Sequence, residues 1–286
     1  MNAIGAIKGT PEQIKLQRIW HETDMEVKKN ILFQGHVEDS IKGTSVYLDG
    51  EPIFPEMKEK KKARMPSNVI VTDFDTYTAA SKLQFEHDET IAVLNFANAE
   101  SPGGCVKLGA KTQEEDLCRS STLYHVLDTK DNQKRFYAPH RKMNKYGLGT
   151  SDIIYTPRIV VFRYGYPSYE YKTPDEFTFV DVITCAAPRF KSAKEFHENV
   201  TTTALYECHF NRGKRIIEAA INNKAKILVL GAFGCGDYHN DPRIVATAYR
   251  DLMLSYSHYF KIVEFAVYCS GKSKKNFNVF KKIILD

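Results

Sequence analysis

The sequence lacks the features that mark disulfide-rich, metal-binding, secreted and membrane-spanning proteins. It has six cysteines but no CxxC pair, so neither a disulfide framework nor a strong zinc motif is indicated. The nearest approach to a metal spacing, Cys235 with His239, has no second pair, and we expect no metal site. No stretch reaches the roughly 18 apolar residues of a membrane span, and residues 1–10 lack the apolar segment of a signal peptide. We expect a cytoplasmic chain without a membrane contact, or a nuclear one if the source is eukaryotic.

The chain also lacks a strong charge of either sign. Its 40 lysines and arginines against 35 aspartates and glutamates give a net charge of +5. This excess suits an anionic ligand but is too small for a nucleic-acid-binding surface coat, so we expect no direct nucleic-acid binding. With 43% hydrophobic residues and 26% charged residues the composition is that of a globular protein. At 286 residues, the chain is long enough for one large or two small domains.

The first 66 residues differ in pattern from the rest of the chain. Residues 10–29 begin with Thr-Pro and mix apolar residues with charges, which predicts an amphipathic helix. Residues 51–66 are rich in proline and lysine, which is typical of a solvated loop or linker. A nuclear-import or nucleic-acid patch is the alternative for the basic run at 58–64, and the solvated loop is preferred. We therefore expect an N-terminal helical extension and basic loop over 1–66, followed by a separate domain over 67–286.

After residue 66, short apolar runs alternate with helical patterns. Strands are predicted near 69–71, 90–96, 179–184, 227–230 and 263–268, and helices over 76–86, 113–127, 196–222 and 242–259. Strands with nearly continuous apolar character lie in sheets that are covered on both faces. The pattern predicts a layered α/β domain.

Two glycine-bearing loops follow predicted strands and precede predicted helices. One contains Gly103 and Gly104, and the other contains Gly231, Gly234 and Gly236. Glycines there let backbone N–H groups approach a ligand closely, and helix N-termini favour anions, so the pair of loops predicts a diphosphate site. Neither loop fits a P-loop, and the second does not complete a GxGxxG motif.

Two consecutive glutamates follow the first glycine loop. Thr112 and Glu115 have the spacing of a capping box, which is one structural explanation of the acidic residues. Their position beyond a strand end also suits general acid and base catalysis, and both roles can coexist. Arg119 is expected to be structural, as an i,i+4 partner of Glu115 on the helix.

At this point the residues resemble a known family. Residues 94–98 (LNFAN) precede PGGC, which is followed after seven residues by QEE and then by LCRSSTLY at 117–124. This combination resembles the microbial-type poly(ADP-ribose) glycohydrolases, a branch of the macrodomain fold. Later segments, AAP at 186–188, GAFGCG at 231–236 and NDP at 240–242, resemble the same family, so the resemblance spans residues 69–283. It implies a three-layer α/β/α macrodomain-like mixed sheet with an N-terminal helical extension, in which residues 67–286 form the macrodomain-like catalytic domain.

The resemblance also implies roles for individual residues. Glu115 would be the catalytic acid and base for the ribose–ribose glycosidic bond, and Glu114 would hold the ribose hydroxyls. Asp75 is a candidate for the adenosine end of the ligand, with a helix cap as its structural alternative. The resemblance places the remaining substrate contacts at Asn98, Gly103, Gly104, Cys105, Gln113, Gly234, Cys235, Gly236, Asp237 and Tyr238.

One position departs from the family pattern, because Cys105 stands where the family has its third glycine. This departure leaves three functions open: hydrolysis of poly(ADP-ribose), removal of a single ADP-ribose unit from protein or nucleic acid, and binding of ADP-ribose without catalysis. The intact pair Glu114 and Glu115 favours an enzyme, since a pure binder gains little from two carboxylates near an anionic ligand. The expected ligand is ADP-ribose or poly(ADP-ribose), free or attached to a protein, and no cofactor or metal is expected.

Overall fold

The computed structural model describes residues 9–54, 56–192, 194, 200–269, 271 and 273–286. The strands are β1 (Ser45–Tyr47), β2 (Val69–Thr72), β3 (Ile91–Phe96), β4 (Ile153–Val161), β5 (Thr178–Cys185), β6 (Ile227–Leu230) and β7 (Ile262–Ala266). The long helices are α1 (Pro11–Lys29), α2 (Ile31–Gly43), α3 (Thr76–Glu86), α4 (Gln113–Ser120), α9 (Thr202–Asn222), α10 (Pro242–Tyr256) and α11 (Lys275–Leu285). The short helical segments are η1 (Val106–Leu108), α5 (Leu123–Leu127), α6 (Lys130–Asn132), η2 (Gln133–Tyr137), α7 (Ala138–His140), η3 (Pro174–Glu176) and η4 (Ser257–Tyr259).

The described strands form one mixed sheet in the order β1-β4-β5-β3-β6-β7-β2. β3 is central and parallel to β5 and β6, with Val93 opposite Val182 and Val229. β4 is antiparallel to β5, and β1 is antiparallel to β4. The carboxyl ends of the parallel strands β2, β3, β5, β6 and β7 therefore meet at one edge of the sheet, where ligands bind in folds of this class.

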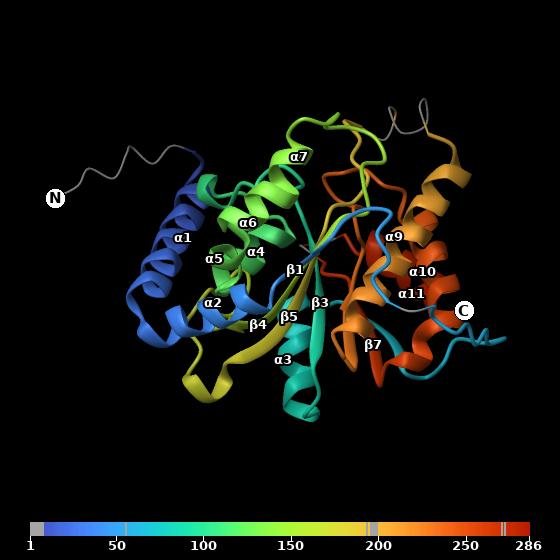
Figure 1. Cartoon of the computed structure of the whole chain (residues 1–286), viewed down its shortest axis with the longest axis horizontal. Coiled ribbons are helices and arrows are strands. Elements are labelled where there is room, and N and C mark those ends of the chain that lie inside the picture. The colour runs from blue at the N-terminus through green and yellow to red at the C-terminus, as the bar shows by residue number, and fades with distance from the viewer. Residues whose placement is uncertain (1–8, 55, 193, 195–199, 270, 272) are drawn as a thin grey trace.

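Two hydrophobic layers cover the sheet. Leu94 of β3 packs in the core cluster beneath α9, α10 and α11, whereas Val93 packs in the cluster beneath α3, α4 and α5. This alternation follows from the pleat of a strand, which directs successive side chains to opposite faces. Figure 1 shows α9, α10 and α11 on one side of the sheet and α1, α2 and α4 on the other. The predicted three-layer α/β/α arrangement is confirmed.

The N-terminal extension packs against the rest of the fold. The predicted first helix is α1, where Thr10 and Gln13 form a capping box and Pro11 occupies the first turn. Trp20 of α1 lies in the core cluster beneath α4 and α5. Strand β1 adds an edge to the sheet, so residues before 66 contribute to the same sheet as those after it. The domain boundary at 66 stays a prediction.

The described residues of 51–54 and 56–66 form a loop that is attached to α10. The amides of Lys60 and Lys62 donate to the carbonyls of Ser255 and Leu254 at 3.1 and 3.0 Å. The side chains of both lysines remain exposed, as the solvated-loop interpretation requires. Among the helices of the described ranges, none combines the length and the apolar character that a membrane crossing needs.

Three predicted helices differ at their ends. The helix predicted over 113–127 divides into α4 and α5 because Thr122 turns toward β4, donating its amide to Val160 O at 3.1 Å. The helix predicted over 242–259 ends at Tyr256 and continues as the turn η4. The helix predicted over 196–222 has its first residues, 196–199, outside the part of the chain that the structure describes. Helix α9 begins at Thr202, and the Thr201 side chain caps its first turn.

The sequence patterns did not predict β4. This strand contains Pro157 and Arg158, and its register shifts between Thr156 and Ile159. Arg158 has a φ of 55°, and such a bulge accommodates a residue that does not continue the ladder. The bulge at Pro157 and Arg158 therefore explains why the apolar pattern of β4 is interrupted.

Candidate active site

A cavity of about 770 Å³ lies at the carboxyl edge of the parallel strands. Its walls are loops that follow β2, β3, β4, β5, β6 and β7, together with the first turn of α4. Its volume is in the range of sites that enclose small molecules and cofactors. Of the residues predicted to contact substrate, it is lined by Asn98, Cys105, Gln113, Glu114, Glu115, Gly234, Gly236, Asp237 and Tyr238.

Glu115 lies against the glycine-bearing loop. Its Oε1 accepts a hydrogen bond from the amide of Cys105 at 2.9 Å, and its Oε2 accepts one from the hydroxyl of Thr112. The predicted capping box is wrong, because the Thr112 side chain caps no amide of α4 and instead donates to Glu115. The carboxyl is fixed between the loop and the helix, and only 5% of the residue is exposed.

Gly104 makes this packing possible. It has a φ of 55°, and a Cβ atom there would overlap Oε1 of Glu115 and lie 3.2 Å from Oε2 of Glu114. Gly103 is also left-handed, with Tyr124 on the side where a Cβ would project. Cys105 itself has a φ of −103°, which any residue adopts, so a side chain at this third position requires no glycine. The cysteine is exposed and lines the cavity.

Glu114 is held deeper than Glu115. Its Oε2 accepts the amide of Asn98 at 2.7 Å, and its Oε1 accepts the Asn95 side chain at 3.4 Å. Burial raises the pKa of Glu114 to about 8, and the neighbouring charge of Glu115 contributes in the same direction. Glu114 is therefore mostly neutral at pH 7, and the pair carries less negative charge than two free carboxylates.

Gln113 ties the start of α4 to the end of β3. Its Oε1 accepts the amide of Phe96 at 2.8 Å, while its Nε2 donates to Leu94 O at 2.7 Å and to Thr76 Oγ1 at 3.0 Å. These bonds occupy both ends of the amide. Gln113 lines the cavity, and its contacts place Glu114 and Glu115 beyond the strand.

Arg119 supports the same loop from behind. The predicted pairing with Glu115 is wrong, because the buried guanidinium instead donates to the carbonyls of Ala110 and, at 3.5 Å, Val106. These carbonyls lie in the segment that connects Cys105 to α4. Arg119 is structural, as expected, but it acts by holding the loop.

The second glycine loop supplies backbone donors. Within the described part of the chain, the amides of Gly236 and Asp237 donate to no protein acceptor, and both residues line the cavity. The amide of Cys235, in contrast, donates to Ala232 O at 3.1 Å, and its partly buried side chain packs against the core, where burial raises the pKa of the thiol. Cys235 is therefore not one of the free donors. Such free N–H groups form a suitable anion site.

The shape of this loop depends on Asn240. Its Nδ2 donates to Pro188 O at 2.7 Å and Gly234 O at 3.0 Å, and its Oδ1 pairs with Nε2 of the buried His209 at 2.9 Å. Gly234 has a φ of 76°, and a Cβ there would lie 2.6 Å from Nδ2 of Asn240. Gly234 therefore serves the fold of the loop.

Asp75 and Asp116 form an acidic wall at the other end of the cavity. Asp75 caps α3 by accepting the amide of Thr78 at 2.9 Å, which confirms the structural alternative, and it also lines the cavity. Asp116 accepts the hydroxyl of Tyr169 at 2.5 Å and the amide of Tyr166 at 3.1 Å. Burial raises the pKa of Asp116 to about 6. The sequence interpretation missed Asp116, although it directly follows the two glutamates.

Helix α1 also reaches this rim. Glu12 pairs with Lys111 at 3.0 Å and accepts the hydroxyl of Tyr166 at 2.9 Å. Both Lys111 and Tyr166 line the cavity. The N-terminal extension thus positions two residues of the site, a link that no local sequence pattern indicates. In the described ranges, no cluster of three histidine, cysteine or acidic residues is arranged to bind a metal ion.

Comparison with known proteins identifies relatives of this geometry. The profile described as "Microbial-type PARG, catalytic domain", where PARG is poly(ADP-ribose) glycohydrolase, matches residues 18–164. Among solved structures, a glutamate-to-alanine mutant of the glycohydrolase from Thermomonospora curvata has a TM-score of 0.80 and 26% identity, covering 94% of this chain and 99% of that chain. That enzyme bound to the inhibitor ADP-HPD has a TM-score of 0.77 and 26% identity, covering 94% and 98%.

A relative from a second organism is also similar. The glycohydrolase from Deinococcus radiodurans in complex with ADP-ribose has a TM-score of 0.69 and 27% identity, covering 86% of this chain and 96% of that chain. Comparison with curated protein sequences gives no match.

Proposed function

The chain belongs to the microbial-type poly(ADP-ribose) glycohydrolase family, and we propose that it hydrolyses the ribose–ribose O-glycosidic bonds of poly(ADP-ribose) and releases ADP-ribose. The observation that carries this proposal is the contact between Glu115 and the Cys105 amide, which fixes one carboxyl at the cavity wall. Structures of two relatives contain ADP-ribose or the inhibitor ADP-HPD, so the ligand expected from the sequence is supported.

An ADP-ribose unit fits the distribution of groups along the cavity. Its diphosphate oxygens would accept hydrogen bonds from the free amides of Gly236 and Asp237, so that binding the diphosphate requires no lysine. Its adenosine would lie toward Asp75, and its distal ribose toward Asn98 and Glu115. Tyr238 would lie against that ribose as the aromatic wall predicted from the sequence.

Glu115 would act first as an acid and then as a base. In the first step its proton passes to the departing ribose oxygen while the glycosidic C–O bond breaks, leaving an oxocarbenium-like carbon. In the second step the Glu115 carboxylate accepts a proton from water as the water oxygen bonds to that carbon. The net reaction adds one water molecule and restores the acid.

Glu114 would hydrogen-bond the ribose hydroxyls and hold the sugar in register. Its two oxygens already accept bonds from Asn95 and Asn98, so the carboxyl is fixed before substrate arrives. Because burial keeps Glu114 mostly neutral at pH 7, it adds little repulsion toward the diphosphate.

The test is ADP-ribose release from poly(ADP-ribose), measured in EDTA for the wild type and for Glu115→Ala. Release by the wild type, lost in a variant that still binds ADP-ribose, supports metal-independent hydrolysis through Glu115. Binding of ADP-ribose without release by the wild type contradicts the proposal. Protein carrying a single ADP-ribose unit then separates a mono-ADP-ribosyl hydrolase from a binding module.

The conformation of Cys105 favours neither alternative, because its backbone leaves the Glu115 contact intact. Attachment of the polymer to a protein and a cytoplasmic location stay predictions of the sequence.

A further inference from the structure

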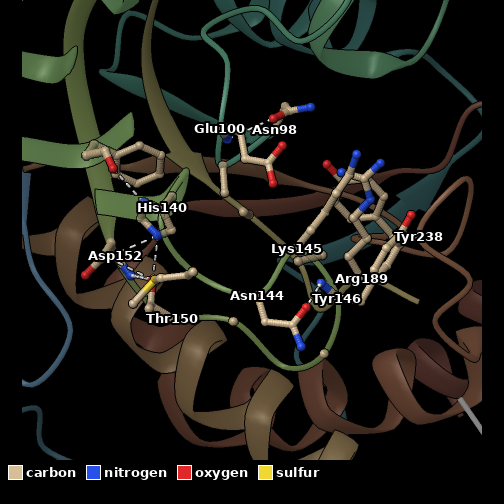
Figure 2. Close-up of a pocket in the computed structure, with 17 residues that line it drawn as sticks. Asn98, Glu100, His140, Asn144, Lys145, Tyr146, Thr150, Asp152, Arg189 and Tyr238 are labelled. Carbon is tan, nitrogen blue, oxygen red and sulfur yellow. Dashed lines mark hydrogen bonds and ion pairs between the residues drawn. The ribbon is translucent and has the colours of Figure 1, made fainter. Parts of the chain in front are cut away.

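A second, smaller cavity adjoins the candidate active site (Figure 2). It has a volume of about 60 Å³ and is enclosed by the segment 143–150 and the loops after β3 and β5. Asn98, Ala187, Arg189 and Tyr238 line both cavities. The smaller cavity therefore begins where the larger one ends, behind Asn98 and Tyr238.

Cationic side chains gather at this second cavity. The charged groups of Lys145, Arg189 and Lys191 lie 6.0, 5.5 and 4.8 Å from the centre of the Tyr146 ring. The guanidinium of Arg189 also lies 5.0 Å from the centre of the Tyr238 ring. An arginine held against aromatic faces keeps its N–H edges available for an oxyanion.

Arg189 and Lys145 have no anionic partner in the part of the chain that the structure describes. Neither side chain donates a hydrogen bond or forms an ion pair with another described residue. Glu100 lines the same cavity and its carboxylate extends into it in Figure 2, but no ion pair joins it to either cation. The charges of Arg189 and Lys145 both lie near the Tyr146 ring and repel each other, and an anionic ligand between them would relieve that repulsion.

The cavity is built on a fixed support. Arg189 and Gly147 exchange backbone hydrogen bonds of 2.8 and 2.9 Å, which pins the middle of the segment 143–150. At its base, His140 contacts Thr150 Oγ1 at 2.8 Å and Asp152 Oδ2 at 3.2 Å. A site held in place before binding loses less freedom when its ligand arrives.

The size of the cavity limits the ligand. A water molecule needs about 10–15 Å³ of such volume, so the roughly 60 Å³ here holds a few waters or one phosphate group, and a nucleoside is too large. Arginine and lysine are the side chains that bind phosphate oxygens.

We propose that this smaller cavity binds a phosphate of the ADP-ribose unit on the leaving side of the scissile bond, through Arg189 and Lys145. The inference rests on the proposed function. When the terminal unit fills the larger cavity as far as Asn98 and Glu115, the leaving oxygen belongs to the adenosine ribose of the next unit. The phosphate on that ribose follows the scissile oxygen within a few bonds, so it lies next to the larger cavity. The Glu100 carboxylate is then available to accept a hydrogen bond from a ribose hydroxyl of that unit.

This arrangement gives the enzyme a means to distinguish a polymer from a single unit. A chain of two or more ADP-ribose units engages both cavities, whereas ADP-ribose alone engages only the larger one. The contribution of Arg189 and Lys145 therefore appears in the affinity for oligomers.

The experiment measures the Kd of ADP-ribose and of a purified ADP-ribose trimer in the Glu115→Gln background, which prevents turnover. Lys145→Gln and Arg189→Gln are compared with Lys142→Gln, an exposed lysine directly before the segment 143–150 that lines neither cavity. We expect Lys145→Gln and Arg189→Gln each to weaken trimer binding about tenfold, the loss typical of one hydrogen bond to a charged group. For Lys145→Gln the ADP-ribose Kd stays within about twofold, and Lys142→Gln changes neither Kd.

An unchanged trimer Kd in Lys145→Gln, or an equal loss for both ligands, overturns the proposal. Thermal melting of each variant confirms that it is folded. If wild-type protein releases no ADP-ribose while Lys145→Gln still weakens only the trimer, the hydrolase proposal fails and the second cavity remains a phosphate site.

Discussion

Gly104 and Glu115 lie so close that a Cβ atom on the glycine would overlap Oε1 of the glutamate. The next residue, Cys105, donates its amide to that same oxygen at 2.9 Å. The glycine loop therefore does more than form a wall for substrate. It determines where the proposed catalytic carboxyl lies.

Gly104→Ala should lower kcat by about 100-fold, because the added methyl group displaces the carboxyl and small misplacements of a catalytic group cost about this much. Strain at a φ of 55° adds to the effect. Gly50→Ala is the control: Gly50 has a φ of 80°, does not line the cavity, and has nothing within 4 Å of its Cβ position. Steady-state ADP-ribose release measures both, and a Gly104→Ala enzyme with normal kcat contradicts the positioning role.

Glu114 should make the protein less stable as the pH rises. Its folded pKa of about 8 exceeds its ordinary value of 4.5, so the unfolded chain releases this proton at a lower pH than the folded protein does. The stabilisation is complete below about pH 4.5 and is lost toward pH 8, by up to about 1.4 kcal/mol per pH unit. Urea unfolding of wild type and Glu114→Gln at several pH values measures the difference. The stability of wild type relative to the variant should decline through this range, and a constant difference would show that Glu114 is ionised when folded.

Arg119→Met should disturb the site through the loop between Cys105 and α4, which Arg119 holds in place. The substitution leaves the Ala110 carbonyl without its donor and removes the longer bond to the Val106 carbonyl, which keeps the Gly109 amide. We expect a loss of about 2–3 kcal/mol in unfolding free energy. The loop that carries the Cys105 amide loosens, so kcat falls as well. Arg135→Met removes another arginine-to-carbonyl bond, to Val46 at 3.1 Å, away from the cavity. It should reduce stability and leave kcat unchanged, and equal kcat values in the two variants would count against the loop role.

Cys105→Ala should retain activity within about threefold, because the φ of −103° suits any residue and the amide remains in place. The wild-type thiol is exposed in the cavity, so saturating ADP-ribose should slow its alkylation. Mass spectrometry of the alkylated peptide measures the rate. Unprotected alkylation would place the ligand away from this wall.

Periodicity was sufficient for most of the parallel sheet. The continuous apolar runs of β3 and β6 predict buried strands, and the helical spacing of α10 predicts its buried face. The interrupted pattern of β4 hid its strand, because Pro157 and Arg158 lie in a bulge that depends on its partner β5.

The site was only partly accessible to sequence reasoning. Glu115 and the glycine loop follow from their place after a strand and from the family motif. Arg189 and Tyr146 were not predicted, since their contact joins a loop after β5 to a segment before β4. The Thr112 cap was predicted from spacing alone, whereas the hydroxyl bonds to the carboxylate because the loop brings both groups together.

The strand order has a consequence for biosynthesis. The edge strand β2 has no partner until β7 is made, and the hydrogen bond from Thr72 to Glu264 spans 192 residues. The ribosome releases the segment with Glu115 early, but the loop with Gly236 and the strand β7 emerge near the end. A chain interrupted before β7 has the proposed catalytic glutamate but an incomplete sheet beneath it, so active enzyme should arise only after synthesis is nearly finished.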